Sequence, residues 1–349
     1  MTKIAHSSPI VSFRDVDIVF GNDPKSALPM IDAGKTRQEI QAETGQILGV
    51  ASASLDIHEG EVLVLMGLSG SGKSTLLRAV NGLNPVIRGE VQVNDGNSYV
   101  NPETCSANDL RELRRSRIAM VFQQFGLLPW RTVSENVGFG LELAGMTPKD
   151  RASKVEEQLK LVGLSGWGEK YVHELSGGMQ QRVGLARAFA TDAPILLMDE
   201  PFSALDPLIR DKLQDELLDL QKELNRTIIF VSHDLDEAAK IGSRIAIMEG
   251  GRIIQLGTPQ EIVKNPEDGY VADFVSHMNP LNVLRARDIM VPPGSLPGSL
   301  ASGLTCEAGT PVREVARLKR SSTEPVVVQK DGAIVGVIGE GELLDCMLK

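Results

Sequence analysis

The sequence is poor in aromatic residues and in cysteine, and it holds no apolar run long enough to cross a bilayer. The three cysteines, Cys105, Cys306 and Cys346, are odd in number and lack metal-site spacing, which favours a reducing compartment. The first residues also lack the apolar core of a signal peptide. We therefore expect a cytosolic chain that reaches a membrane only through a partner.

The sequence also has fewer basic residues than acidic ones. The chain has 36 Lys and Arg residues against 46 Asp and Glu residues, for a formal net charge of −10. A chain of this sign has no general electrostatic attraction to nucleic acid, so no nucleic-acid partner is expected. The length of 349 residues is sufficient for one large domain and a small one.

Strand-like and helical patterns alternate along the chain, which predicts an α/β fold with a largely parallel sheet. Three apolar runs, 61–66, 194–200 and 227–234, indicate buried strands that lead into a glycine-rich loop or polar residues. In such sheets the chemistry gathers at the carboxyl ends of the strands. The sites of interest are therefore expected directly after these runs.

The other patterns divide the chain into domains. Residues 1–280 are expected to form the main domain, with a helical subdomain region over 108–190 and a hairpin over 246–257. The proline- and glycine-rich composition of 281–304 indicates a linker. A short α/β pattern resumes over 305–349 and predicts a small second module.

An unusual insertion occupies 21–49. Its stretch "AGKTRQE" looks like a phosphate-binding loop, but Pro29 stands where the first glycine is needed and no strand precedes it. Thr36 and Glu39 fit a helix-capping box better. We therefore predict a surface helical segment over Lys25–Gly45.

The stretch "GLSGSGKST" fits the P-loop pattern G-x-x-x-x-G-K-[ST], with a predicted strand before it and a predicted helix after it. Glycines let the backbone amides close around phosphates, Lys73 reaches the terminal phosphates, and the Ser74 hydroxyl is placed for magnesium. The predicted nucleotide-binding residues are Gly67, Leu68, Ser69, Gly70, Ser71, Gly72, Lys73, Ser74 and Thr75.

Four polar residues follow other strand-like runs. Asp199 ends "ILLMD" and is a candidate magnesium ligand, and Glu200 beside it is a candidate general base for an attacking water. His233 follows "TIIFVS", where an imidazole could hold the γ-phosphate and the water. Gln123, after another strand-like run, could touch both magnesium and water. Taken alone, Gln123 is better explained by a structural role than by a role in the site.

A second glycine-containing loop raises a question. The stretch "LSGGMQQRVGLARAFA" places Ser176, Gly177 and Gly178 at a predicted helix start, where amides and the helix dipole favour an anion. One P-loop is enough to hold one nucleotide. The second loop is therefore expected to serve a different site.

Six motifs together resemble the ATP-binding subunits of ABC transporters. They are "GLSGSGKST", "VFQQFGLLPW", "LSGGMQQRVGLARA", "ILLMDEP", "SALD" and "VSHD", in the family's order and approximate spacing. The resemblance covers about Ile10 to Gly257 and implies ATP and Mg²⁺ as cofactors. It implies an ABC-type P-loop fold with a mostly parallel sheet and a helical subdomain.

The resemblance also implies roles residue by residue. Phe20 is similar to the aromatic residue that stacks on adenine, and Asp206 in "SALD" to the residue that couples two sites. The loop with Ser176, Gly177, Gly178 and Gln180 would cover the γ-phosphate bound to a second copy. The resemblance thus implies a homodimer, and it explains the second loop as half of a shared site.

Two further features resemble one branch, the ATPases for uptake of glycine betaine, proline betaine and choline. They are the insertion over 21–49 and a C-terminal extension, which in that branch usually holds a pair of CBS modules. Here 305–349 matches only about one CBS-like module, so sensing by this module stays open. The branch implies two membrane-spanning permease subunits, a separate substrate-binding protein, and a place at the cytoplasmic face of the inner membrane.

Other functions compete with this one. An importer ATPase for another small solute, such as an amino acid, would share every motif named above. A soluble ABC-type ATPase acting on nucleic acid or ribosomes usually has two cassettes or a long coiled coil, and neither pattern occurs here. A P-loop kinase would not need Glu200 beside Asp199, because that pair suits activation of water.

Overall fold

The computed structural model describes residues 8–295, 303–320, 322 and 324–347. The chain forms two compact units. The first takes in the described residues up to His233 together with Ala246–Ile254. The second takes in Asp234–Ile245 and the described residues from Gln255 onward. Within the described ranges, no helix has both the length and the apolar character needed to span a bilayer.

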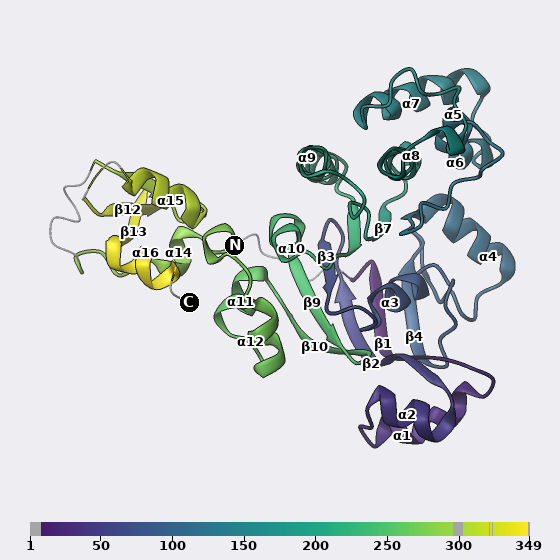
Figure 1. The fold of residues 1–349 in the computed structure, drawn as a ribbon, viewed down its shortest axis with the longest axis horizontal. Helices are drawn as coiled ribbons and strands as arrows, with labels where there is room; N and C mark the ends of the chain where they lie inside the picture. Colours follow the sequence, from purple (N-terminus) through teal and green to yellow (C-terminus); the bar gives the residue numbers. More distant parts are fainter. Residues whose placement is uncertain (1–7, 296–302, 321, 323, 348–349) are drawn as a thin grey trace. The chain divides into compact units, whose positions relative to one another are not determined.

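The first unit is built on two sheets (Figure 1). An antiparallel sheet has the order β2-β1-β4-β5. A six-stranded sheet has the order β10-β9-β3-β8-β7-β6, in which β3, β8, β7 and β6 run parallel. The strands are β1 (Val11–Phe20), β2 (Ile47–Ile57), β3 (Val62–Met66), β4 (Arg88–Asn94), β5 (Tyr99–Val100), β6 (Ile118–Val121), β7 (Ile195–Asp199), β8 (Thr227–Val231), β9 (Arg244–Glu249) and β10 (Arg252–Gly257).

Every residue of β3, β7 and β8 is buried, as expected for apolar strands covered on both faces of a parallel sheet. Helix α3 (Lys73–Ala79) contacts β2 of one sheet and β7 and β8 of the other. The helix that follows the glycine-rich loop therefore lies between the two sheets. The predicted α/β fold with parallel strands is confirmed.

A group of helices lies beyond β7, on the side of the first unit away from the insertion (Figure 1). Helix α8 lies at its centre and contacts α5, α6 and α7. The helices of this part are α4 (Ala107–Glu112), α5 (Val133–Val137), α6 (Phe139–Leu143), α7 (Pro148–Leu161), α8 (Gly177–Ala190) and α9 (Pro207–Leu224), with the π-helical η2 (Leu113–Arg117) and the 3-10 helix η3 (Val172–Glu174). The region predicted as helical over 108–190 thus also contains a strand, β6, which pairs with β7.

The insertion folds as η1 (Pro24–Ala27), α1 (Leu28–Asp32) and α2 (Arg37–Thr44). The Thr36 hydroxyl accepts a hydrogen bond from the Glu39 amide, and the Glu39 carboxylate accepts one from the Thr36 amide. The predicted capping box is therefore present. Residues 47–49, placed in the insertion by the sequence, already belong to β2.

The second unit contains a small sheet of order β11-β12-β13, with β11 parallel to β12 and β12 antiparallel to β13. Its elements are α10 (Leu235–Ile241), α11 (Pro259–Lys264), α12 (Gly269–Val275), α13 (Pro280–Val283), α14 (Ala286–Ile289), β11 (Thr305–Glu307), α15 (Val312–Lys319), β12 (Val326–Lys330), β13 (Ala333–Ile338) and α16 (Glu340–Met347).

The structure differs from the predicted linker over 281–304. Its first part forms α13 and α14, and Leu284 and Ala286 are buried in one core with Val312 and Val326. Helix α13 also contacts α10 and α11, which is why these elements join the second unit although the sequence placed them in a domain over 1–280. Residues 296–302 of the predicted linker lie outside the described residues.

Candidate functional site

The glycine-rich loop connects β3 to α3, in the strand, loop and helix order that the motif predicts. A Cβ on Gly67, where φ is 139°, would lie 2.1 Å from the Met248 carbonyl oxygen. A Cβ on Gly72, where φ is 105°, would lie 2.4 Å from the Gly49 carbonyl oxygen. Only glycine fits at these two positions, because the loop is pressed against backbone on both sides.

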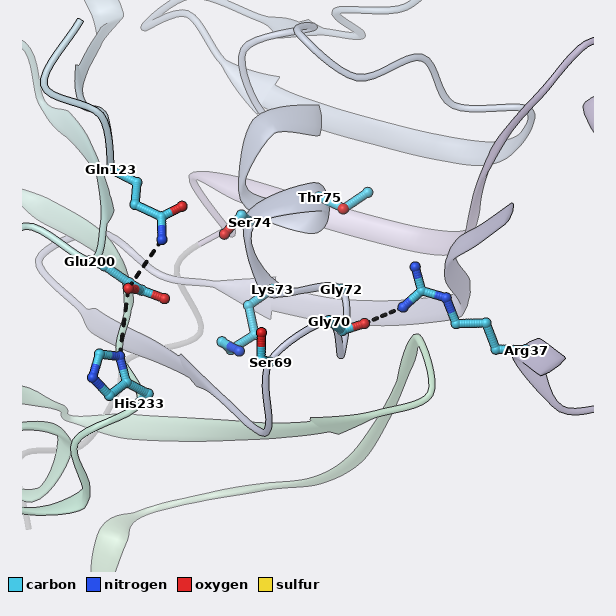
Figure 2. Close-up of a pocket in the computed structure, with 10 residues that line it drawn as sticks. All are labelled: Arg37, Ser69, Gly70, Gly72, Lys73, Ser74, Thr75, Gln123, Glu200 and His233. Carbon is cyan, nitrogen blue, oxygen red and sulfur yellow. Dashed lines mark hydrogen bonds and ion pairs between the residues drawn. The ribbon is translucent and has the colours of Figure 1, made fainter. Parts of the chain in front are cut away.

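A pocket of about 430 Å³ opens beside this loop (Figure 2). It brings together nine of the predicted site residues, namely Ser69, Gly70, Gly72, Lys73, Ser74, Thr75, Gln123, Glu200 and His233. The tenth lining residue, Arg37, comes from the insertion and was not among the predicted site residues. Gly67, Leu68 and Ser71 do not line the pocket. Leu68 exposes 62% of its surface and Ser71 is buried.

Lys73 lies buried at the first position of α3. Its Nζ donates hydrogen bonds to the carbonyl oxygens of Gly67 at 2.9 Å and Leu68 at 3.0 Å. Burial lowers the pKa of the Lys73 ammonium, while the Glu200 and Asp199 carboxylates act in the opposite direction. The ammonium thus folds back on its own loop, where phosphate oxygens could replace the two carbonyl groups.

The carboxylate of Asp199 is fully buried at the end of β7. It accepts hydrogen bonds from Ser74 Oγ at 2.6 Å and from Arg78 Nη2 at 2.7 Å. Two of the three predicted magnesium ligands, Ser74 and Asp199, are therefore in contact, whereas the third, Gln123, bonds to Glu200. Sequence reasoning missed Arg78, although Arg78 follows Ser74 by four residues and so lies on the same face of α3.

Gln123 and His233 converge on the carboxylate of Glu200 (Figure 2). Gln123 Nε2 donates to Glu200 Oε2 at 3.3 Å, and His233 Nδ1 lies 3.6 Å from the same oxygen. Glu200 has a φ of 49°, a left-handed conformation that is uncommon for residues other than glycine. Three residues predicted separately, each at the end of a different strand, therefore meet at one oxygen atom.

Phe20 is the last residue of β1 and pairs with Ile47 of β2. A Cβ on Gly49 would lie 2.9 Å from both the Phe20 ring and the methyl group of Thr75. The ring is therefore next to the end of the P-loop, although Phe20 does not line the pocket itself. Gly49 was not singled out in the sequence, where nothing marks its close approach.

Ser176 caps α8 by accepting a hydrogen bond from the Met179 amide, and Gly177 and Gly178 begin the helix. Gln180 Nε2 donates to the carbonyl oxygens of Val172 and Leu175 at 3.2 and 3.1 Å. None of the four predicted signature residues lines the P-loop pocket. The predicted coupling residue, Asp206, caps α9 by accepting from the Ile209 amide at 3.1 Å.

Two residues of α8 that the sequence reasoning missed connect this helix to the pocket. The buried Gln181 donates to the Glu200 carbonyl oxygen at 3.3 Å. Arg187, whose pKa is lowered by burial, donates to the carbonyl oxygens of Phe125 at 3.0 Å and Gly126 at 2.7 Å. These bonds connect α8 to the backbone of Glu200 and to the loop that follows Gln123.

Comparison with known proteins places the chain in a family. The family model described as ABC transporter matches residues 50–203. A glycine betaine transport ATP-binding protein of Bacillus subtilis is 51% identical over 280 residues, which cover 80% of this chain and 66% of that protein. A trimethylamine N-oxide transport system ATP-binding protein of Ruegeria pomeroyi is 44% identical over 343 residues, which cover 98% of each.

Among solved structures, a dimeric ATP-binding cassette in a post-hydrolysis state, bound to ADP and Pi, matches with a TM-score of 0.62 and 30% sequence identity. The match covers 71% of this chain and 98% of the cassette. The predicted ABC-type P-loop fold is thereby confirmed. Because a relative that is 44% identical matches nearly the full length of both chains, this chain belongs to the ATP-binding proteins of ABC transporters.

Proposed function

We propose that this chain binds MgATP at the P-loop and hydrolyses it, as one of two copies that energise uptake of a quaternary ammonium compound. The observation that carries the enzymatic part is the convergence of Gln123 and His233 on the Glu200 carboxylate beside the P-loop. The proposed substrate class is carried by the relatives, which serve glycine betaine and trimethylamine N-oxide transport.

The P-loop side chains fit a magnesium nucleotide. Lys73 would exchange its two carbonyl partners for phosphate oxygens. The Ser74 hydroxyl, the Asp199 carboxylate and the Gln123 amide oxygen are the hard oxygen donors that magnesium prefers. When bound, magnesium neutralises charge on the phosphate oxygens. Phe20, next to Thr75, is proposed to stack on adenine.

Glu200 is the proposed general base. Its carboxylate is only 19% exposed, at the edge of the pocket, where it could take a proton from a water aimed at the γ-phosphate. Gln123 would hold that carboxylate and the water in place through its amide. The His233 ring, 65% exposed, would hold the γ-phosphate and the water from the open side.

The signature residues support action as a pair of identical chains. Ser176, Gly177, Gly178 and Gln180 lie outside the P-loop pocket of their own chain, as we expect of residues that act on the nucleotide of a second copy. The matching cassettes in solved structures are dimeric. Asp206, at the start of α9, would link the two sites across that interface.

An apolar groove offers a place for a membrane-spanning permease. It has a volume of about 370 Å³, and its lining includes Leu83, Met120, Phe122, Phe139 and Leu143. Leu83 and Leu143 expose 46% and 57% of their surfaces. Because exposed apolar side chains normally cluster where a partner binds, this groove is a candidate docking surface. A short helix from one permease subunit would dock here on each of the two copies, and it would hold the chain at the cytoplasmic face of the inner membrane.

The transported solute would bind elsewhere, to the permease and to a separate substrate-binding protein. A trimethylated nitrogen is common to glycine betaine and trimethylamine N-oxide, and aromatic side chains hold such groups by cation–π attraction. Choline or a betaine is therefore the proposed solute, and an amino acid or other small solute is the alternative. The small sheet of the second unit is proposed to form a single CBS-like module.

Uptake in cells provides the test. Cells that express the chain, cells without it, and cells with a Lys73→Ala chain are compared for labelled choline, glycine betaine, proline betaine and histidine. We expect uptake of a quaternary ammonium compound to need the unaltered chain. Uptake of histidine alone would support the alternative solute class. A pull-down with the chain gives a second test. If it recovered ribosomes or DNA and no membrane protein, the transport function would be contradicted.

A further inference from the structure

The insertion ahead of the P-loop is a folded element with a fixed place on the first unit. Ile31 and Ile40 are buried in one apolar cluster with Val19 of β1 and Leu48 of β2. The carboxylate of Asp32 pairs with Arg88 of β4 at 2.7 Å. The insertion therefore has the packing that is needed to hold a side chain in a defined position.

Arg37, the first residue of α2, points from this insertion to the P-loop. Its Nη1 donates a hydrogen bond to the Gly70 carbonyl oxygen, and Figure 2 shows it on the side of the loop opposite to Glu200. A Cβ on Gly70 would lie 3.7 Å from the same nitrogen. Arg37 also lines the pocket. Arg37 and Lys73 are thus the two Lys or Arg side chains among the residues that line the pocket.

The guanidinium has bonding capacity left over. It carries five N–H groups, and the bond to Gly70 uses one of them. Across the part of the chain that the structure describes, no carboxylate forms an ion pair with Arg37, whereas the neighbouring Lys35 pairs with Glu39 at 3.2 Å. A half-buried guanidinium at the rim of a phosphate pocket favours an anionic ligand, because its planar donors match phosphate oxygens.

We propose that Arg37 binds a phosphate group of the nucleotide, from the side opposite to Glu200. The proposal rests on the proposed nucleotide site at the P-loop. Lys73 would hold the phosphates from inside the loop, and Arg37 would hold them from outside it. The hydrogen bond to the Gly70 carbonyl oxygen would keep the Arg37 guanidinium in position for this contact. The insertion then contributes directly to nucleotide affinity.

Nucleotide titration tests this proposal with the full chain, MgATP and MgADP as probes, and a matched control. Arg37→Gln and Lys35→Gln each remove one positive charge from the start of the same helix. We expect Arg37→Gln to weaken binding of both nucleotides roughly threefold to tenfold. Lys35→Gln should bind as the parent does. Arg37→Lys, which keeps the charge, should fall between the parent and Arg37→Gln.

Two further measurements separate nucleotide binding from a purely structural contact. Because Arg37 acts on the bound nucleotide, the KM for ATP should rise in Arg37→Gln while kcat stays near the parent value. The salt dependence of ATP affinity should also weaken. Parent-like affinity in Arg37→Gln, or an equal loss in Lys35→Gln, would overturn the inference. Parent-like affinity in Lys73→Ala would instead overturn the nucleotide site itself.

Discussion

Arg78 gives a quantitative test of how the end of β7, which carries the proposed magnesium ligand Asp199, is held in place. It neutralises Asp199, whose carboxylate is fully buried, through a bond of 2.7 Å. We consider Arg78→Met, which keeps most of the apolar stem and removes the charge. The variant leaves a buried carboxylate with the hydrogen bond from Ser74 as its remaining side-chain bond among those described above.

The expected loss of unfolding free energy follows from how deeply the ion pair is buried. Removing one partner of a fully buried ion pair costs about 3 to 5 kcal/mol. Arg78 is 36% exposed, so water screens part of its charge, and a charge-assisted hydrogen bond contributes about 1.5 to 3 kcal/mol. We therefore expect Arg78→Met to lower the free energy of unfolding by about 2 kcal/mol, measured by urea denaturation without nucleotide.

A double-mutant cycle isolates the pair. In an Asp199→Asn background the buried charge is absent, so Arg78→Met should cost only about 0.5 kcal/mol, as for an ordinary surface substitution. High salt should shrink the cost in the parent background more than in the Asp199→Asn background. Equal costs in the two backgrounds would refute the reasoning, because Arg78 would then stabilise the chain through packing alone.

Three other perturbations have defined outcomes. Glu200→Gln keeps the shape of the side chain but not its basicity, so phosphate release should fall at least about 100-fold while ATP still binds; turnover near the parent rate would remove Glu200 as the base. Gly49→Ala places a methyl group 2.9 Å from the Phe20 ring, so the KM for ATP should rise while Gly269→Ala, with open space around it, leaves KM unchanged. Hydrogen bonds of the helix cap lower the pKa of Glu39 from 4.5 to about 2, so its contribution to stability is present above pH 4.5 and lost as the pH falls towards 2. Glu39→Gln should flatten that part of the pH dependence in urea unfolding, and a slope equal to that of the parent would contradict this assignment.

Much of the pocket is predictable from the sequence because its signals are local. Lys73 and Ser74 belong to a contiguous motif between a strand and a helix, and Asp199 and Glu200 directly follow an apolar run. Parallel strands bring such ends to one edge of a sheet, so His233 could be placed there as well. These residues needed no knowledge of how distant segments pack.

The residues that were not predicted form hydrogen bonds to segments that are distant in the sequence. Arg187 reaches a loop 61 residues before it, and Gln181 reaches a backbone carbonyl 19 residues after it. Arginine and glutamine are ordinary helix residues, so no pattern marks these contacts in advance. The helices α13 and α14 were missed because four residues are too few to show a helical period.

The position of α8 has a mechanical consequence. One end of this helix begins with Ser176 and Gly177, its middle holds the Glu200 backbone through Gln181, and its later turns hold the loop after Gln123 through Arg187. A rigid displacement of α8 must therefore carry along the ends of two strands or break these bonds. A pull on the apolar groove, which Arg187 also lines, would consequently shift the backbone of Glu200, so the proposed docking surface and the proposed general base would move together through α8.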